Sequence, residues 1–539
     1  MKAHRSWRAV LGGFAGAALL QAQPAPAVEE LTRRLAETNA QLERALAEQQ
    51  RVNEELMRRL QAMEARLVGV SPATVSTATP PGGIAVVPGA PRGKPGVASE
   101  PTPAPPPAAA GRPPPAWQPS DPIRLGGQKT FLDLGLTGTV AAGGSTASDI
   151  AGGLELGGHD PNQRGFTLQG LELNLAGAVD PYFRANANLA FGLDAGGEST
   201  LELEEAWAET AALPANLQVR AGQMYAEFGR HNPTHLHTWA FVDTPLVNGR
   251  FLGPDGLRNP GARLSWLAPT PFYSQLLVGV QNSQGETAAG FRSDDGHGHG
   301  DEEPLPFTYR HADNDRGVST LSDLLFTPRY EMSWDLTRSV TLLLGGSAAF
   351  GPNSRGGEDA GDTTTQIYGV DMTWKWKSPR HHGGFPFVAW QTEGLLRKYD
   401  AGAFDWGDEA GEGLTDVVVD TQTGEPAVLV GETLTDYGFY TQVLWGFRRG
   451  WVTGLRLDSL WGDRAAYERQ PLVFNGDPLG RDPQRVDRWR LSPSLTWYPT
   501  EYSRLRLQYN YDDRQEFGVD HSVWFQLEFS LGAHAAHRF

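Results

Sequence analysis

Residues 521–532 read His-Ser-Val-Trp-Phe-Gln-Leu-Glu-Phe-Ser-Leu-Gly, and most of them alternate with a period of two. The apolar positions are Val523, Phe525, Leu527, Phe529 and Leu531. The polar positions between them are Gln526, Glu528 and Ser530. Successive side chains of a β-strand point to opposite faces, so this stretch predicts a strand with one apolar and one polar face.

The same alternation recurs upstream, in 504–511 (Arg-Leu-Arg-Leu-Gln-Tyr-Asn-Tyr), in 436–447 and in 171–179. Between Asp121 and Phe539 the pattern predicts about 16 such strands, an even number as in bacterial membrane barrels. The mean hydropathy of the chain is negative, and no run of about 18 apolar residues occurs, which excludes a helical membrane protein. Alternating strands keep the average hydropathy low while still offering an apolar face.

The connections between the expected strands also alternate, in length. Short turns are expected at 180–181, 213–215, 337–338, 448–450 and 499–501. Long polar segments lie near 141–165, 226–260, 282–327, 398–433 and 462–487. This rhythm, with a terminal aromatic at Phe539, predicts an all-β transmembrane barrel with both chain ends in the periplasm. A soluble β-sandwich or propeller is the alternative, but it gives no reason for the alternation.

The first quarter of the chain differs in composition from the rest. Residues 1–27 combine early basic residues, a short apolar run and small residues, which predicts a secretory signal peptide cleaved after Ala22 or Ala27. A signal anchor is the alternative, but the run is well below the roughly 20 residues of a membrane span. The chain has no cysteine, which excludes disulfides and thiolate sites, and its net charge of −17 disfavours nucleic-acid binding.

Residues 28–68 show heptad spacing of Val28, Leu35, Leu42, Leu56 and Met63, which predicts an N-terminal α-helical coiled coil. This segment favours a homo-oligomer, with a trimer as the expected state, and would sit in the periplasm in reach of the cell wall. A single amphipathic helix on another surface remains the alternative. Residues 69–120 are rich in proline and predict an extended linker, so the barrel is expected to occupy 121–539.

Three stretches resemble the phosphate-selective porin O and P family of outer-membrane porins. They are Asp180-Pro-Tyr-Phe183, Val219-Arg-Ala-Gly-Gln223 followed by Glu227-Phe-Gly229, and the hairpin from Tyr498 to Tyr509. The resemblance implies a trimeric barrel in which the segment from Glu227 to Pro260 folds into the pore. It also implies a lysine ladder, but the chain has six lysines, of which only Lys129, Lys375, Lys377 and Lys398 fall in the barrel. Phosphate selectivity is therefore not expected to carry over.

If the apolar faces meet lipid, the polar faces line the lumen. The expected pore-wall residues are Glu172, Glu202 and Glu204 on the early strands and Arg456, Arg488, Arg490, Arg504 and Arg506 on the late ones. Separated in this way, acids and arginines would set a transverse field that filters ions. The alternative is that these charges only solvate a water-filled interior.

Two loops carry candidate ligands. The expected constriction residues are Arg230, His231, His235, His237, Asp243, Arg250, Asp255 and Arg258. Within them, His235 and His237 have a spacing compatible with a metal on an extended strand, although this is also ordinary loop sequence. The second loop offers Asp294, Asp295, His297, His299 and Asp301 as ligands for weakly bound zinc, the one cofactor considered. A disordered acidic loop is the alternative there.

These observations predict a porin in the outer membrane of a Gram-negative-type cell, surrounded by lipid and passing small hydrophilic solutes or ions by passive diffusion. Two alternatives stay open: a channel for divalent metal such as zinc, and a structural tether to the cell wall with a plugged barrel. No nucleophile motif, paired metal-ligand helix motif or phosphate loop stands out, so an enzyme is not expected. A TonB-dependent receptor would need a folded plug domain before the barrel.

Overall fold

A computed structural model of the chain describes residues 123–126, 131–178, 180–194, 196–292, 305–311, 318–354, 363–409 and 416–532. The chain divides into two units, Met1–Ala110 and Gly111–Phe539, and every described residue belongs to the second. The predicted signal peptide (1–27), coiled coil (28–68) and linker (69–120) lie outside the described residues.

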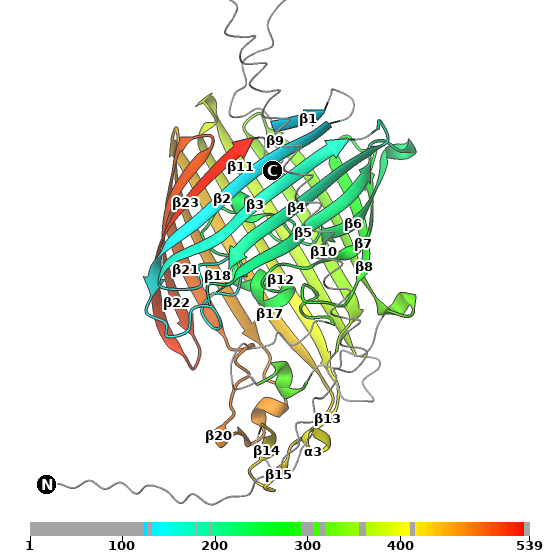
Figure 1. The fold of residues 1–539 in the computed structure, drawn as a ribbon, viewed down its shortest axis with the longest axis vertical. Coiled ribbons are helices and arrows are strands. Elements are labelled where there is room, and N and C mark those ends of the chain that lie inside the picture. Colours follow the sequence, from blue (N-terminus) through cyan, green and yellow to red (C-terminus); the bar gives the residue numbers. More distant parts are fainter. Residues whose placement is uncertain are drawn as a thin grey trace, which may run out of the picture. The chain divides into compact units, whose positions relative to one another are not determined.

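Long antiparallel strands follow one another around a single sheet (Figure 1). The first eight are β2 (Phe131–Ser145), β3 (Gly165–Ala178), β4 (Phe183–Leu193), β5 (Ser199–Thr210), β6 (Leu217–Tyr225), β7 (Arg258–Leu267), β8 (Tyr273–Asn282) and β9 (Leu324–Thr337). The second eight are β10 (Val340–Pro352), β11 (Thr364–His382), β12 (Phe385–Ala401), β17 (Glu432–Arg448), β18 (Trp451–Gly462), β21 (Arg488–Thr500), β22 (Ser503–Arg514) and β23 (Gly518–Gly532). A further short strand, β1 (Ile123–Gly126), pairs with the start of β2.

The ring closes where the first long strand meets the last. β2 pairs with β23 from Gly135 opposite Gly532 to Ser145 opposite Ser522. Closure gives each of the 16 long strands a neighbour on both sides, as a bilayer requires, because its core offers no water to backbone N–H and C=O groups. The predicted fold, a closed all-β barrel of 16 antiparallel strands, is confirmed.

The two ends of the barrel differ as the sequence predicts. Short turns join β3 to β4, β9 to β10, β11 to β12, β17 to β18 and β21 to β22, and the barrel begins and ends at this short-turn end. The opposite, long-loop end carries the long segments. Two connections there are short, between β4 and β5 and between β22 and β23, so the alternation is less regular than the sequence pattern indicates.

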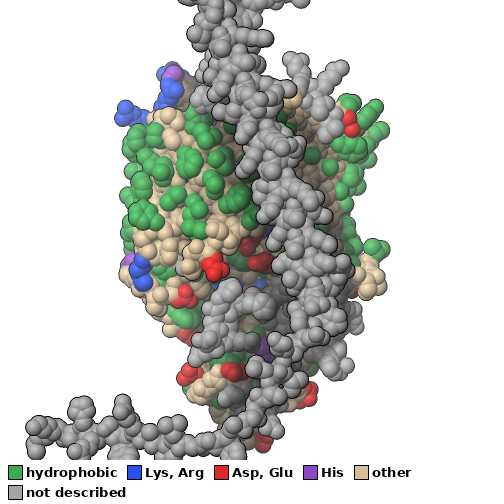
Figure 2. Space-filling view, viewed as in Figure 1, with side chains coloured by type: hydrophobic (Ala, Val, Ile, Leu, Met, Phe, Trp, Pro, Cys, Tyr) green, Lys and Arg blue, Asp and Glu red, His purple; other side chains and the backbone are tan. Residues whose placement is uncertain are grey.

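The outer surface of the wall is apolar. On β23 the outward residues Val523, Phe525 and Leu531 are 50%, 46% and 50% exposed, while Gln526 between them is 1% exposed. Figure 2 shows hydrophobic side chains spread over the wall, with charged side chains gathered toward its two ends. This belt is the surface of a membrane-spanning barrel. Among the described residues, no helix has the length and hydropathy that a membrane span requires.

Several long loops build a small cap at the long-loop end. Its short strands are β13 (Phe404–Asp405), β14 (Val418–Asp420), β15 (Glu425–Pro426), β16 (Val428–Leu429), β19 (Leu472–Phe474) and β20 (Asp477–Pro478). Its helices are α3 (Trp406–Glu409), η3 (Phe307–Tyr309) and η5 (Tyr467–Arg469). Trp406, Tyr309 and Tyr467 are buried at its centre. The remaining helices of the described residues are η1 (Pro214–Asn216), η2 (Leu236–Thr238), α2 (Leu246–Leu252) and η4 (Leu321–Asp323).

The membrane belt predicts that an outward arginine costs stability according to its depth. Phe525→Arg, near the middle of β23, should lower the free energy of unfolding by about 2–4 kcal/mol, because the charge would enter hydrocarbon. Val519→Arg, outward on the same strand but near the long-loop end, should cost about 0–1 kcal/mol. Denaturant unfolding in lipid vesicles measures both changes. Equal losses for the two variants would show that the outward face does not lie in hydrocarbon.

Candidate pore constriction

The connection between β6 and β7, residues 226–257, folds into the barrel rather than away from it. We call it the lumen loop. Its residues bond to wall strands all round the ring: Gly229 N–H donates to Ser347 Oγ on β10, and Leu246 N–H donates to Asp458 on β18. His237 contacts Glu172 on β3. Helix α2 of this loop accordingly lies within the outline of the barrel in Figure 1.

Asp243 is the centre of the contact between the lumen loop and the late strands. Its Oδ1 accepts from Arg456 (2.8 Å) and Gln508 (2.8 Å), and its Oδ2 accepts from Arg490 (2.7 Å) and Asn510 (2.8 Å). Burial by itself would raise the pKa of Asp243, but the charges of Arg456 and Arg490 outweigh it and lower the pKa to about 2. Asp243 is therefore ionised at neutral pH.

The late-strand arginines hold loop backbone as well as carboxylates. Arg504 donates to Trp239 O (3.0 Å), and Arg506 donates to Phe241 O (2.7 Å) and Trp239 O (2.9 Å). Arg488 and Arg490 reach the first long loop, residues 146–164, through Leu154 O. The structure thus places all the predicted arginines on the inner wall, but loop atoms cover them and the guanidinium groups are almost fully buried.

The predicted acids lie on the early strands β3 and β5, where the histidines of the lumen loop meet them. His235 Nδ1 lies 2.9 Å from Glu204 Oε2, and His235 Nε2 lies 3.1 Å from Glu205 Oε2. His237 pairs with Glu172, and the two imidazoles stack with 5.9 Å between ring centres. Glu202 pairs with Arg258 at the start of β7.

Glu205 reaches the lumen because β5 is irregular. Asn188 pairs with Glu205 but the next residue of β4, Leu189, pairs with Leu203, so Glu204 is an extra residue in β5. Such a β-bulge turns two consecutive side chains to the same side. A strict alternation of side chains along β5 predicts that Glu202 and Glu204 face the lumen and that Glu205 does not. No feature of the sequence indicates the bulge.

Glu393 on β12 anchors the beginning of the lumen loop. It accepts the backbone N–H groups of Arg230 (3.2 Å) and His231 (3.3 Å) and the hydroxyl of Tyr440 (3.1 Å). The loop turns there at Gly229, with φ +62°, and a Cβ at that residue would overlap the Glu393 carboxylate. His231 is neutral, since burial and then the charge of Arg456 lower its pKa to about 3.

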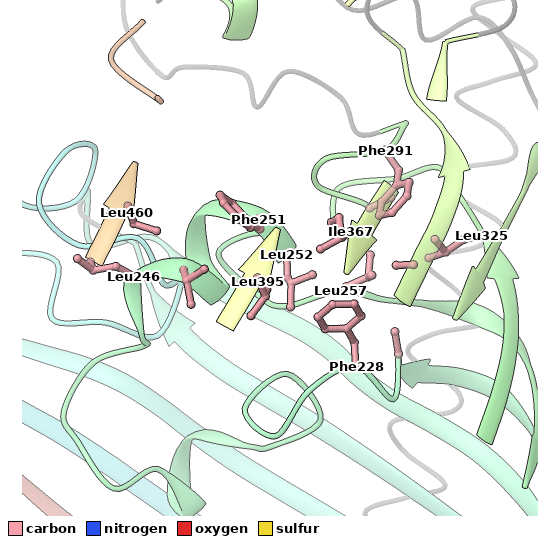
Figure 3. Close-up of a cluster of buried hydrophobic side chains, with 14 of the residues drawn as sticks. Phe228, Leu246, Phe251, Leu252, Leu257, Phe291, Leu325, Ile367, Leu395 and Leu460 are labelled. Carbon is pink, nitrogen blue, oxygen red and sulfur yellow. The ribbon is translucent and has the colours of Figure 1, made fainter. Parts of the chain in front are cut away.

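An apolar cluster fills the rest of the space between the lumen loop and the wall (Figure 3). The loop contributes Phe228, Leu246, Phe251, Leu252 and Leu257, and the wall contributes Leu325, Ile367, Leu395 and Leu460. Gly369 and Gly438 make room for this cluster. A Cβ at Gly369 would lie 2.9 Å from the Phe228 ring, and a Cβ at Gly438 would lie 2.6 Å from the Val247 side chain. The inner wall is thus partly apolar, which corrects the expectation of a uniformly polar lumen face.

The remaining predicted constriction residues lie at the margins of this loop. Arg250 donates to Val486 O (2.7 Å), which links α2 to the loop before β21. Asp255 lies near the end of the lumen loop and borders a small cavity with His159 and Tyr225. The predicted zinc ligands Asp294, Asp295, His297, His299 and Asp301 lie outside the described residues.

On the short-turn side of the lumen loop the barrel holds a cavity of about 940 Å³, which we call the vestibule. Its basic lining residues are Arg220, Arg230, Arg263, Arg329, Arg338, Lys375 and Lys377, and its acidic ones are Glu209, Glu227 and Glu331. His231, Thr234 and Trp239 of the lumen loop form its far wall. The other predicted barrel lysine with a described position, Lys398, is exposed and does not line the vestibule.

The fold defines a membrane-spanning β-barrel with one loop folded inward. Comparison with known proteins shows the family to which the chain belongs. An uncharacterized protein of Aquifex aeolicus (strain VF5) is 31% identical over 407 residues, which cover 71% of this chain and 73% of the relative. The chain belongs to the same family as that protein. No protein-family model matches the sequence.

Solved structures with a similar course of the chain are outer-membrane proteins. The outer membrane channel DcaP of Acinetobacter baumannii has a TM-score of 0.43 at 12% identity, covering 74% of this chain and 97% of that one. The anion-selective porin from Comamonas acidovorans has a TM-score of 0.40 at 10% identity, covering 74% and 100%. OmpF of Salmonella typhi in complex with daunomycin has a TM-score of 0.40 at 10% identity, covering 76% and 100%.

The ion pairs of Asp243 predict that one substitution loosens the lumen loop. Asp243→Asn should lower the free energy of local loop opening by about 3 kcal/mol, because two buried arginines lose their shared carboxylate but keep Asp458 and Asp512. Hydrogen exchange of the amides of 239–246 measures this. The exposed Asp477→Asn is the control and should leave exchange unchanged. Unaltered exchange in Asp243→Asn would show that other contacts alone hold the loop.

Proposed function

We propose that this protein is an outer-membrane porin through which small hydrophilic solutes and ions diffuse passively, with the lumen loop as its constriction. The observation that carries the proposal is the combination of an apolar outer belt, a charged vestibule of about 940 Å³ and one loop that crosses the lumen above it. A purely structural barrel has no need for a cavity lined by ten charged side chains.

The orientation of the barrel is inferred from the lengths of its connections. Barrels of this kind place short turns in the periplasm and long loops outside the cell. The vestibule then opens toward the periplasm, and the cap of β13 to β20 faces the exterior. An N-terminal coiled coil over 28–68, a Pro-rich linker over 69–120 and a homotrimer would complete this arrangement, with the coiled coil in reach of the cell wall. The resemblance to the phosphate-selective porin O and P family also stays a prediction.

The charges support filtering of ions at the vestibule rather than at the deeper arginines. Arg456, Arg490 and Arg506 are at most 1% exposed, and each is bound to carboxylate or carbonyl groups of the loops. A buried and paired charge exerts little field on a passing ion. Lys375 and Lys377 line the vestibule itself, where a permeating ion would meet them. They are the residues whose charge should set the ion preference.

A plugged barrel is the second candidate. The number of buried bonds between the lumen loop and the wall favours it, because a loop held at Asp243, Glu393 and His235 leaves the lumen narrow. Uptake of divalent metal through the surface loop of His297 and His299 stays a prediction, since that loop lies outside the described residues.

Single-channel recording in planar bilayers separates the open from the plugged barrel. The purified, heat-modifiable protein should give stepwise openings in KCl, grouped in threes if it is a trimer. The double variant Lys375→Glu and Lys377→Glu should lower the ratio of chloride to potassium permeability about threefold. Each charge reversal changes the energy of an ion about 8 Å away by about 1 kcal/mol before screening by salt.

Lys398→Glu is the matched control for this experiment. Lys398 is exposed outside the vestibule, so its reversal should leave the permeability ratio unchanged. A bilayer that stays silent with folded protein would favour the plugged barrel. If the double variant opens but keeps the permeability ratio of the unmodified protein, residues other than Lys375 and Lys377 set the ion selectivity.

A further inference from the structure

A second site lies where the first long loop, strand β5 and the lumen loop meet. His159 of the first long loop has its Nε2 3.2 Å from Glu204 Oε1 and 3.9 Å from Glu202 Oε2. All three ligand-type atoms lie within 4.8 Å of one another. Ligand atoms around a tetrahedral zinc with bonds of about 2.0 Å are about 3.3 Å apart. The distance from His159 to Glu204 matches this value, and the distance from His159 to Glu202 is somewhat longer.

The imidazole of His159 is fixed in the orientation that a metal ligand needs. Its Nδ1 lies 2.9 Å from Gln169 O, and the Gln169 side chain donates in return to His159 O (2.7 Å). When Nδ1–H donates to a backbone carbonyl, the Nε2 lone pair is left for a cation, as is usual for histidines that bind metals. That lone pair points at two carboxylates, an arrangement that is repulsive unless a positive charge lies between them.

Unsatisfied polar atoms and a small cavity mark the same place. The cavity measures about 20 Å³ and is bordered by His159, Glu204, Asp255 and Asn248. A space of about 10–15 Å³ is enough for one water molecule. Asn248 is 3% exposed, and both atoms of its amide lack a hydrogen-bond partner among the described residues. Buried amides are rarely left unsatisfied, so a bound ligand or water is expected beside it.

We propose that His159, Glu202 and Glu204 bind a divalent transition-metal cation, with Asp255 and Asn248 beside the remaining coordination positions. Imidazole nitrogen and carboxylate oxygen are both ligand types that zinc takes. The second carboxylate oxygens are already bound, that of Glu204 to His235 and that of Glu202 to Arg258. These outer contacts orient the ligands. The cation would tie the first long loop to strand β5, beside Asp255 and Asn248 of the lumen loop.

The proposed site does not depend on whether the barrel conducts ions, and it is separate from the loop that carries His297 and His299.

The test uses the full chain with His297→Ala and His299→Ala, so that these two histidines cannot contribute to metal binding. After treatment with a chelator, the folded protein should bind one zinc per chain in isothermal titration. Substituting a residue that only orients a metal ligand typically weakens metal binding about 10- to 100-fold. Because His159 and Glu204 are proposed as ligands themselves, His159→Ala and Glu204→Gln should each weaken zinc binding by more than that. His521→Ala, at an exposed histidine of β23, should leave binding unchanged.

Cobalt supplies a second readout that does not rely on the most buried ligand. Co²⁺ in the same background should give visible absorption bands of a low-coordinate nitrogen and oxygen site, and Glu202→Gln should abolish them. Glu202 is 31% exposed at its side chain, so this variant should keep the fold and its heat-modifiable migration. If His159 instead carries a proton and pairs only with Glu204, the chain binds neither metal, and the proposal fails. If the protein binds zinc but shows no openings in planar bilayers, the metal site is supported and the proposed porin function is rejected.

Discussion

Asp243 is buried between Arg456 and Arg490, and none of these side chains could be buried alone without a large desolvation cost. Arg456 also has Asp458 on the wall, but Arg488 and Arg490 share Asp512, so these wall groups carry one positive charge more than negative, and the loop carboxylates Asp243 and Glu155 compensate it. Buried ion pairs contribute little net stability, but they define position strongly, because a shifted loop would leave charges unpaired. The place of the lumen loop in the barrel, and with it the shape of the vestibule, depends on this contact.

The lumen loop meets the wall at two charged regions. The early strands contribute Glu172, Glu202, Glu204 and Glu205 to the first region, and the late strands contribute the arginines, with Asp458 and Asp512 beside them, to the second. The lumen loop matches both: its histidines face the acids, while Asp243 and the carbonyls of Trp239 and Phe241 face the arginines. Complementary charge of this kind fixes the direction in which the loop crosses the lumen. Between the two polar contacts, the cluster around Phe228 and Leu395 excludes water and adds the nonspecific part of the stabilisation.

Much of the barrel is predictable because its constraint is local and periodic. Residues 523–531 and 504–511 show which side chains face lipid, since side chains alternate along any strand and the bilayer demands an apolar face. The lengths of the connections predict which end carries the long loops. The prediction fails where the period is broken. The bulge at Glu204 shifts the phase of β5, so the period does not predict Glu205, and wall residues such as Ile367 and Leu395 are apolar on the inner face because a loop packs on them.

The sequence by itself determined the class of fold, the faces of the strands and the two unlike ends, and only its resemblance to a porin family indicated the loop that folds into the barrel. Only the tertiary structure decided how these parts meet. Glu393, His159 and Glu205 are far in sequence from the residues they contact, and no local pattern distinguishes them from other polar residues. The physical reason is that burial alternates locally along each strand, whereas contacts across the lumen depend on ring closure and register, which bring residues tens to hundreds of positions apart within hydrogen-bonding distance.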